Sequence, residues 1–449
     1  MKRKKVERII DRLALGLFLL STAFVVFGYG VIVGRYQIFP FNTLLKMQNA
    51  IQVSMGLYQN PELKPHHLYP IWYDYSGVRI HNANSIMRGV TLLTSYWPFL
   101  DWKPGIVLID STGEILHMWE TDPSKIWPTS PYTDHVKGSL NTSENYVHGC
   151  YLFENGDIIF NIEYMGLVRM NVHGEVLWTL PYRTHHSVSR DQDGCFWVCG
   201  LKWIEDNPEG RERLTHYAGL NLPIAEDFAL KVTEDGEILR EISILKVLYE
   251  NGYQQLIRQM SGRRTGDILH TNKVEALRSD IADQYTLFDA GDIVVSSRVL
   301  NSIFVLDTET EKIKWLCNRF LLQHDPDFLD NGWICVFDNN ADIENENVPY
   351  PGGSRIIAVN PGNNEMRTLY PKTNEQEFFT GGGGKVQNLP NGNLLITEAR
   401  RGRVFETDPS GRVVWEWVHE KYNSDFIPEV LEGTRYFLTR QRIAEWRTK

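Results

Sequence analysis

Residues 320–340 read FLLQHDPDFLDNGWICVFDNN, with one apolar stretch on each side of Asp330-Asn331-Gly332. Asparagine followed by glycine between apolar stretches is a strong short-range signal for a tight β-hairpin. His324 precedes the turn glycine by eight residues, which places it at the start of the first predicted strand. Because the same pattern recurs along the chain, this stretch defines the unit from which we predict the fold.

The recurrence places other polar residues at the heads of predicted strands. In three further hairpins a head residue stands eight positions before the turn glycine, and a fourth, longer hairpin begins at His270. We expect the residues at the strand heads to form one functional cluster, in which His185 and Lys385 are the weaker candidates. The heads and their glycines are His148 with Gly156, His186 with Gly194, Gly384 (next to Lys385) with Gly392, and His270 with Gly291.

A second strand pair follows each hairpin, so the chain contains an internal repeat of four strands. The first strand pair has no hairpin before it, whereas Ile427–Thr439, with Gly433 as its expected turn, is an unmatched hairpin at the C-terminus. Joining these two parts in one sheet completes a sixth unit. The second strand pairs are Gly105–Trp119, Gly166–Trp178, Phe228–Leu239, Ser302–Trp315, Arg355–Leu369 and Arg403–Trp415.

Six four-stranded units whose two ends share one sheet predict an all-β protein with a six-bladed β-propeller. Closure of the ring hides strand edges that an open array would expose. A β-sandwich would explain the strands, but it explains neither the repeat nor the shared terminal unit. We assign residues 105–449 to the propeller and residues 34–104 to a linker or N-terminal cap, and we expect the histidines in this cap to lie on the surface.

The N-terminus carries a predicted membrane anchor. Leu13–Val33 is an uncharged stretch of 21 residues, long enough to span a bilayer as a helix. Residues 1–12 are rich in Lys and Arg, whereas Arg35 is nearly alone on the other side. By the positive-inside rule residues 1–12 form a cytoplasmic tail. We therefore expect a single-pass inner membrane protein with a periplasmic C-terminal domain; a cleaved signal peptide is the alternative.

The charge and the cysteine content of the chain bear on which partners and metal sites the protein can have. The net charge of −10 and the isoelectric point near 5.8 argue against nucleic acid as the main partner. The five cysteines have no spacing typical of a zinc site, and we expect buried thiols or at most one disulfide. No cofactor or metal is predicted, and the sequence does not indicate the oligomeric state.

The strand heads predict an active site, because the first strand of each propeller blade lines the central channel. The heads should therefore meet at one mouth, and Arg298 joins them from the end of the strand that follows His270. Clustered imidazoles fit either a metal site or a histidine nucleophile. Arg298 favours the nucleophile, since a fixed cation weakens metal binding. An imidazole of ordinary pKa would lose its free lone pair below about pH 6.

Five short motifs, in this order and spacing, resemble those of bacterial arylsulfate sulfotransferases, and the similarity covers about residues 105–420. Asn388–Asn393 and Gly402–Glu406 are similar to the last blade of that family. The five motifs are Thr184-His185-His186, Asp267-Ile268-Leu269-His270-Thr271-Asn272, Ser296-Ser297-Arg298, Gln323-His324-Asp325 and Phe337-Asp338-Asn339.

The resemblance implies an enzyme that moves a sulfuryl group from an aryl sulfate to a phenol without a nucleotide sulfate donor. His324 corresponds to the sulfated histidine, His186 and His270 to the supporting histidines, and Arg298 and Asn272 to groups that contact the sulfuryl oxygens. His148 and Lys385 are expected to contact substrate at the same mouth. A non-catalytic binding propeller and a histidine-ligated metal oxygenase remain alternatives, and the identity of the acid–base histidine stays open.

Overall fold

The computed structural model describes residues 2–36, 67–129, 131–132, 146–260, 265–343 and 345–446. The chain divides into two units, Met1–Lys64 and Pro65–Lys449. In the first unit, helix α1 (Lys2–Tyr36) contains the segment Arg12–Arg35, which is long and apolar enough to cross a membrane. This helix includes the stretch predicted from the sequence.

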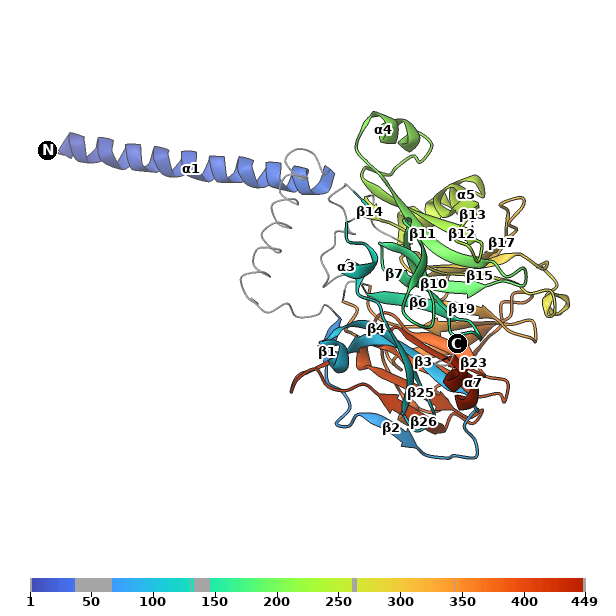
Figure 1. The fold of residues 1–449 in the computed structure, drawn as a ribbon. Coiled ribbons are helices and arrows are strands. Elements are labelled where there is room, and N and C mark those ends of the chain that lie inside the picture. Colours follow the sequence, from blue (N-terminus) through green and yellow to red (C-terminus); the bar gives the residue numbers. More distant parts are fainter. Residues whose placement is uncertain are drawn as a thin grey trace. The chain divides into compact units, whose positions relative to one another are not determined.

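The second unit is a β-propeller of six blades, as the repeat predicted (Figure 1). Five blades are antiparallel sheets whose strands follow each other in the chain. They are β6 (Val147–Leu152), β7 (Ile158–Ile162), β8 (Gly166–Met170) and β9 (Val176–Leu180); β10 (Arg183–Arg190), β11 (Phe196–Ile204), β12 (Ile224–Val232) and β13 (Ile238–Ser243); β15 (Thr271–Ala276), β16 (Ile293–Ser297), β17 (Ser302–Leu306) and β18 (Ile313–Cys317); β19 (His324–Phe328), β20 (Ile334–Asp338), β21 (Arg355–Val359) and β22 (Met366–Tyr370); and β23 (Lys385–Asn388), β24 (Leu394–Glu398), β25 (Arg403–Thr407) and β26 (Val413–Val418).

The remaining blade closes the ring differently from the prediction. Its strands are β28 (Glu432–Tyr436), β3 (Val90–Trp97), β4 (Lys103–Ile109) and β5 (Ile115–Glu120), in this order across the sheet. The C-terminus therefore supplies one strand to this blade, and the predicted hairpin Ile427–Thr439 is wrong. The fully buried strand β3 comes from the segment 34–104, so the propeller begins before residue 105.

Gly433 explains the error, because it is a packing glycine and not a turn glycine. It lies inside β28 opposite Leu93. A Cβ at this position would come within 2.5 Å of Thr397 Oγ1 and 2.8 Å of Val404 Cγ2 in the neighbouring blade. The absent side chain lets β28 approach the last blade closely enough to close the ring.

Further elements decorate the blades. Strand β2 extends the last blade along β26, and β14 runs parallel to β12. The predicted helical insertion 245–260 forms two helices, and the five cysteines form no disulfide. These elements are β1 (Leu68–Pro70), β2 (Gly77–Ile80), β14 (Gly266–Asp267), β27 (Phe426–Pro428), α3 (Pro123–Ile126), α4 (Pro208–Leu214), α5 (Ile244–Glu250), α6 (Gln254–Met260), α7 (Arg440–Trp446), η1 (Pro98–Leu100), η2 (Ala282–Gln284), η3 (Asn374–Gln376) and η4 (Ala399–Arg401).

The core consists of apolar layers between neighbouring blades. Side chains alternate along each strand, so each strand contributes to two layers. In β16, Ile293 and Val295 pack against the preceding blade, whereas Val294 packs against the following one. Leu93 and Trp415 belong to the layer that joins the first and last blades, which lie side by side in Figure 1. This layered ring is the rigid support for the channel mouth.

Candidate active site

The innermost strands bulge where they begin, and these bulges carry polar residues into the mouth of the channel. The pairing of β6, β10 and β19 with the next strand skips residues 148–149, 186–187 and 325–326. His186, His270 and Asp325 have φ angles of 56°, 51° and 50°. A bulge changes the direction of a side chain, and non-glycine residues with positive φ are uncommon and concentrate at functional sites.

The bulges bring four predicted histidines together. The ring centroid of His186 lies 4.1 Å from that of His148, 5.0 Å from that of His270 and 6.3 Å from that of His324. We call these four residues the histidine cluster. His185 adjoins it, with its Nδ1 2.9 Å from His186 Nδ1. The sequence spacing alone thus identified residues that meet in space.

His324 is held in one tautomer. Its Nδ1 lies 2.7 Å from Asn339 Oδ1 and 2.9 Å from the Leu322 carbonyl oxygen. Asn339 Nδ2 donates to the carbonyl oxygens of Thr380 and Gly383, which fixes Oδ1 as the atom that faces the imidazole. Both neighbours of Nδ1 are acceptors, so Nδ1 carries the proton and Nε2 keeps its lone pair.

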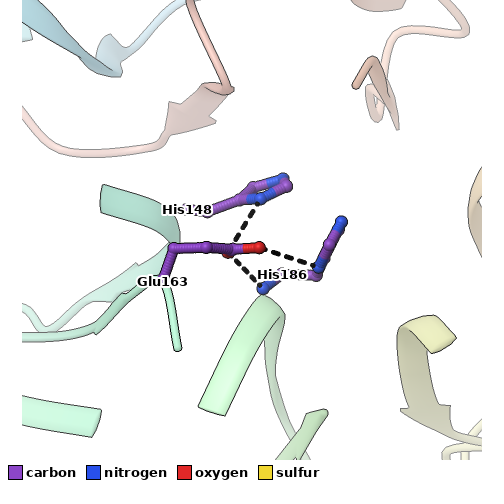
Figure 2. Close-up of side chains that lie close together, drawn as sticks. All are labelled: His148, Glu163 and His186. Atoms are coloured by element: carbon purple, nitrogen blue, oxygen red, sulfur yellow. Dashed lines mark hydrogen bonds and ion pairs between the residues drawn. The ribbon is translucent and has the colours of Figure 1, made fainter. Parts of the chain in front are cut away.

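Glu163 joins two members of the histidine cluster, as Figure 2 shows. Its Oε2 lies 3.2 Å from His148 Nδ1, and its Oε1 lies 3.6 Å from His186 Nδ1. One ligand atom from each of these residues lies within 4.8 Å of the others, so the three could hold a metal ion. Burial alone would raise the pKa of Glu163, but the nearby imidazoles, first that of His148, hold it below its ordinary value.

His270 and Asn272 have partners that fix their positions. Asp267 Oδ2 lies 2.5 Å from His270 Nδ1. An ionised carboxylate only accepts hydrogen bonds, so this contact places the imidazole proton on Nδ1 and leaves Nε2 for other partners. Asn272 Nδ2 donates to the Gln323 carbonyl oxygen at 2.8 Å, so Asn272 supports the backbone directly before His324.

The two predicted cations have different surroundings. The Arg298 amide donates to the His270 carbonyl oxygen, and the Arg298 guanidinium forms an ion pair with Glu346. Lys385 Nζ instead lies 2.5 Å from Glu432 Oε1 on β28. Among the described residues, no contact of Lys385 with the histidine cluster is present, so the structure brings Arg298 but not Lys385 to this cluster.

Burial makes three imidazoles of this site, those of His324, His185 and His186, poor bases. It lowers the pKa of His324 to about 3, and the positive charge of Arg298 acts in the same direction. Burial likewise lowers the pKa of His185 to about 4 and that of His186 well below its ordinary value. A lowered pKa keeps an imidazole neutral to lower pH. The sequence-based expectation that His324 loses its lone pair below about pH 6 is therefore replaced by a threshold near the lower pKa.

Sequence reasoning missed several residues of this site. Glu163 and Asn339 stand seven residues after the turn glycines Gly156 and Gly332, the same spacing as Arg298 after Gly291. The first residue after the second strand of a blade thus reaches the mouth, and this spacing was available in the sequence. Asp267 and Asn339 stand inside quoted motifs, but neither residue received a role.

The cap histidines differ from one another. His67 was expected on the surface, but its side chain is only 19% exposed, its Nδ1 is 2.8 Å from Glu429 Oε2, and its ring centroid is 3.9 Å from that of Tyr146. Tyr146 in turn lies 6.0 Å from His148, which places His67 beside the site. His81 is 45% exposed, as expected, and His66 lies outside the described residues.

The sequence model of the arylsulfotransferase (ASST) family matches residues 150–420. This segment covers more than half of the chain and includes His186, His270, Arg298 and His324. The chain belongs to the arylsulfotransferase (ASST) family. The resemblance found in the sequence motifs is thereby confirmed, and membership in the ASST family supports sulfuryl transfer as the general chemistry.

Comparisons with curated proteins and with solved structures add nothing more specific. No curated protein matches the chain. A protein of unknown function from Bacteroides caccae is 16% identical (TM-score 0.45; 73% of this chain and 93% of that chain covered). A chain of a nidogen/laminin complex is 10% identical, with a TM-score of 0.42, and the match covers 78% of this chain and 100% of that chain. Virginiamycin B lyase from Staphylococcus aureus is 12% identical, with a TM-score of 0.35, and the match covers 67% of this chain and 88% of that chain. These likenesses are too distant to carry an argument.

Proposed function

We propose that this protein transfers a sulfuryl group from an aryl sulfate ester to a phenol through a covalent intermediate on His324, without a nucleotide sulfate donor. The observation that carries the proposal is the fixed tautomer of His324, whose Nδ1 faces two oxygen acceptors. A neutral imidazole with a free lone pair on Nε2 can attack sulfur without an additional base.

The proposed reaction has two steps. First, the Nε2 lone pair of His324 forms a bond to sulfur, the sulfur–oxygen bond to the aryl group breaks, and the electron pair leaves with the phenolate. Second, the oxygen of the acceptor phenol attacks the same sulfur, and the nitrogen–sulfur bond breaks. Arg298, His186 and Asn272 would hold the sulfuryl oxygens, since fixed donors stabilise charge that develops in a transition state.

We assign the proton transfers to His270. Its Nδ1 is held by Asp267 at 2.5 Å, which leaves Nε2 to exchange a proton with the phenol oxygen. His186 is less suited, because burial lowers its pKa well below the ordinary value and so disfavours the protonated ring that must donate to the phenolate. In this assignment His270 begins the cycle as an imidazolium, with protons on both Nδ1 and Nε2. The Nε2 proton goes to the departing phenolate, and the neutral Nε2 then takes the proton of the acceptor phenol, which restores the imidazolium.

The direct test is to trap the intermediate. The full-length protein is exposed to an aryl sulfate with an acidic phenol, without acceptor, and its peptides are analysed by mass spectrometry. We expect a sulfuryl group on the peptide that contains His324. Because the pKa of His324 is lowered to about 3, labelling should persist from about pH 8 to about pH 5. Absence of label, or a label on another residue, would contradict the proposal.

Asp267→Asn should slow transfer most for donors whose phenols are weak acids. The amide can donate as well as accept, so it no longer fixes the proton on His270 Nδ1. We expect a loss in kcat of about 10²- to 10⁴-fold for such donors and a much smaller loss for donors with acidic phenols. Asp193→Asn, at an exposed turn, is the control. An equal loss for all donors would point to a purely structural role for Asp267.

We further propose that α1 anchors the protein in the inner membrane with the propeller on the periplasmic side. The basic residues before the apolar segment Arg12–Arg35 support this orientation. Protease added to the periplasmic side of spheroplasts should digest the propeller. Digestion from the cytoplasmic side alone would reverse the orientation.

A second candidate function uses the same residues as metal ligands. The proximity of His148, Glu163 and His186 favours it, because two imidazoles and a carboxylate suit several transition metals. Metal analysis of the purified protein distinguishes the two functions. Stoichiometric iron, copper or zinc, with activity lost on chelation and restored by the metal, would favour the metal enzyme.

A further inference from the structure

Two arginines at the channel mouth share one carboxylate. Glu346, in the loop between β20 and β21, forms an ion pair through Oε1 with Arg298 and through Oε2 with Arg400, the latter at 2.6 Å. All three side chains are largely buried, with exposures of 13% for Arg298, 19% for Arg400 and 31% for Glu346. The two guanidinium groups therefore converge on a single anion position.

A run of glycines gives this arrangement its space. A Cβ at Gly381 would collide with the carbonyl oxygen of Glu346, and a Cβ at Gly382 would lie 2.5 Å from the Arg400 guanidinium. The next glycine, Gly383, offers its carbonyl oxygen to Asn339, which holds His324. The glycine run thus lets the Glu346 loop and Arg400 sit directly beside the supports of His324.

We propose that Arg400 is a second sulfate-binding guanidinium and that Glu346 is an internal anion, which the sulfate group of an aryl sulfate displaces from Arg298 and Arg400. This inference rests on the proposed function and extends it, because it names the groups that recognise the donor. The donor class it selects is a monoester of sulfate, which carries a single negative charge at neutral pH.

Charge balance supports this exchange. Burial alone would raise the pKa of Glu346, but Arg298 and Arg400 hold it at about 2, so the carboxylate is ionised at neutral pH. A sulfate monoester replaces one negative charge by another and offers three oxygens to two planar forks. When Glu346 leaves, Arg400 keeps a second carboxylate nearby, since its Nε lies 4.0 Å from Glu429 Oε1.

The exchange has a measurable cost. A site that is occupied by a carboxylate of the same protein binds an external anion more weakly. Its apparent Kd equals the intrinsic Kd divided by the fraction of molecules in which the site is free. Removing the charge of Glu346 should therefore tighten anion binding, whereas removing Arg400 should weaken it. If Glu346 only held the loop in place, removing its charge would not tighten anion binding, because a loosened loop would not increase the affinity of the two arginines for an anion.

The experiment measures the Kd of inorganic sulfate by calorimetry on the full-length protein at constant chloride concentration. We expect Glu346→Gln to lower Kd by roughly tenfold, because one charge-assisted competitor is lost. Arg400→Ala should raise Kd by a similar factor. The control is Arg401→Ala, which removes the neighbouring guanidinium that stacks on Trp72 at 4.4 Å and should leave Kd unchanged.

Each outcome is decisive. An unchanged or raised Kd in Glu346→Gln with a wild-type melting temperature would overturn the inference. Were Glu346→Gln to unfold, the comparison of Arg400→Ala with Arg401→Ala would decide, and equal Kd values would reject Arg400. Sulfate binding needs no chemistry at His324, so the expected Kd changes without any sulfurylated His324 would remove the proposed function and leave the anion site in place.

Discussion

His324→Ala should give a folded protein that neither accepts a sulfuryl group nor turns over. The side chain is buried, and among the described residues its hydrogen-bond partners are all at Nδ1, so alanine removes the proposed nucleophile together with two hydrogen bonds. We expect turnover to fall by about 10⁶-fold, the scale observed when a covalent mechanism loses its nucleophile. Peptide mass spectrometry and a steady-state assay measure the two losses together.

Two comparisons sharpen this result. His173→Ala removes an exposed imidazole from the turn between β8 and β9 and should retain full labelling and turnover. Arg298→Ala should slow transfer by about 10²- to 10³-fold, and Arg298→Lys should recover only part, since an ammonium cannot copy the planar fork. Substantial turnover in His324→Ala would show that another residue carries the sulfuryl group.

The sequence predicted the site as far as its regular spacing extends. His148, His186 and His324 share one position relative to their turn glycines, and the closed ring turns that shared position into proximity. The same reasoning, applied to the residue after the second strand, would have found Glu163 and Asn339. The spacing cannot show the bulge in each strand. The positive φ of His186 depends on the segments packed around it and not on the local sequence.

Other contacts were beyond any local pattern. Glu346 and Arg400 are separated by 54 residues and meet only because glycines in a third segment leave room for them. His67 was misjudged for the same reason, since its partner Glu429 is 362 residues away. Long-range ion pairs of this kind follow from the closed ring, and the position of such partners requires the three-dimensional structure.

The closure of the ring shows how one residue type supports two interpretations. Glycine between apolar residues predicts a turn, yet Gly433 continues a strand because the adjoining blade occupies the space of its side chain. The repeat correctly predicted that the two chain ends share a blade. The repeat could not show how many strands each chain end supplies. The reason is that β28, the strand that stands before β3 in this sheet, lies at the other end of the sequence.

Deleting Glu432–Lys449 should prevent folding of the propeller, because it removes the innermost strand of the closing blade. Arg435 on β28 is buried, forms an ion pair with Glu406 on β25 at 3.2 Å and donates to Thr91 Oγ1 on β3 at 2.9 Å. The deletion exposes the edge of β3 and part of the apolar layer that joins the first and last blades. The expected loss of several kcal/mol is comparable to the whole stability of a domain.

A shorter deletion provides the control for ring closure. Removing Arg440–Lys449 takes away α7, including Trp446, but leaves β28 in place. This variant should fold with a lowered melting temperature, whereas the longer deletion should show no cooperative transition. Arg435→Ala should have an effect between those of the two deletions. It should lower the free energy of unfolding by about 3–5 kcal/mol, because it leaves the buried Glu406 without its ion-pair partner. A protein without β28 that melts like the full chain would mean that the ring does not depend on this strand for closure.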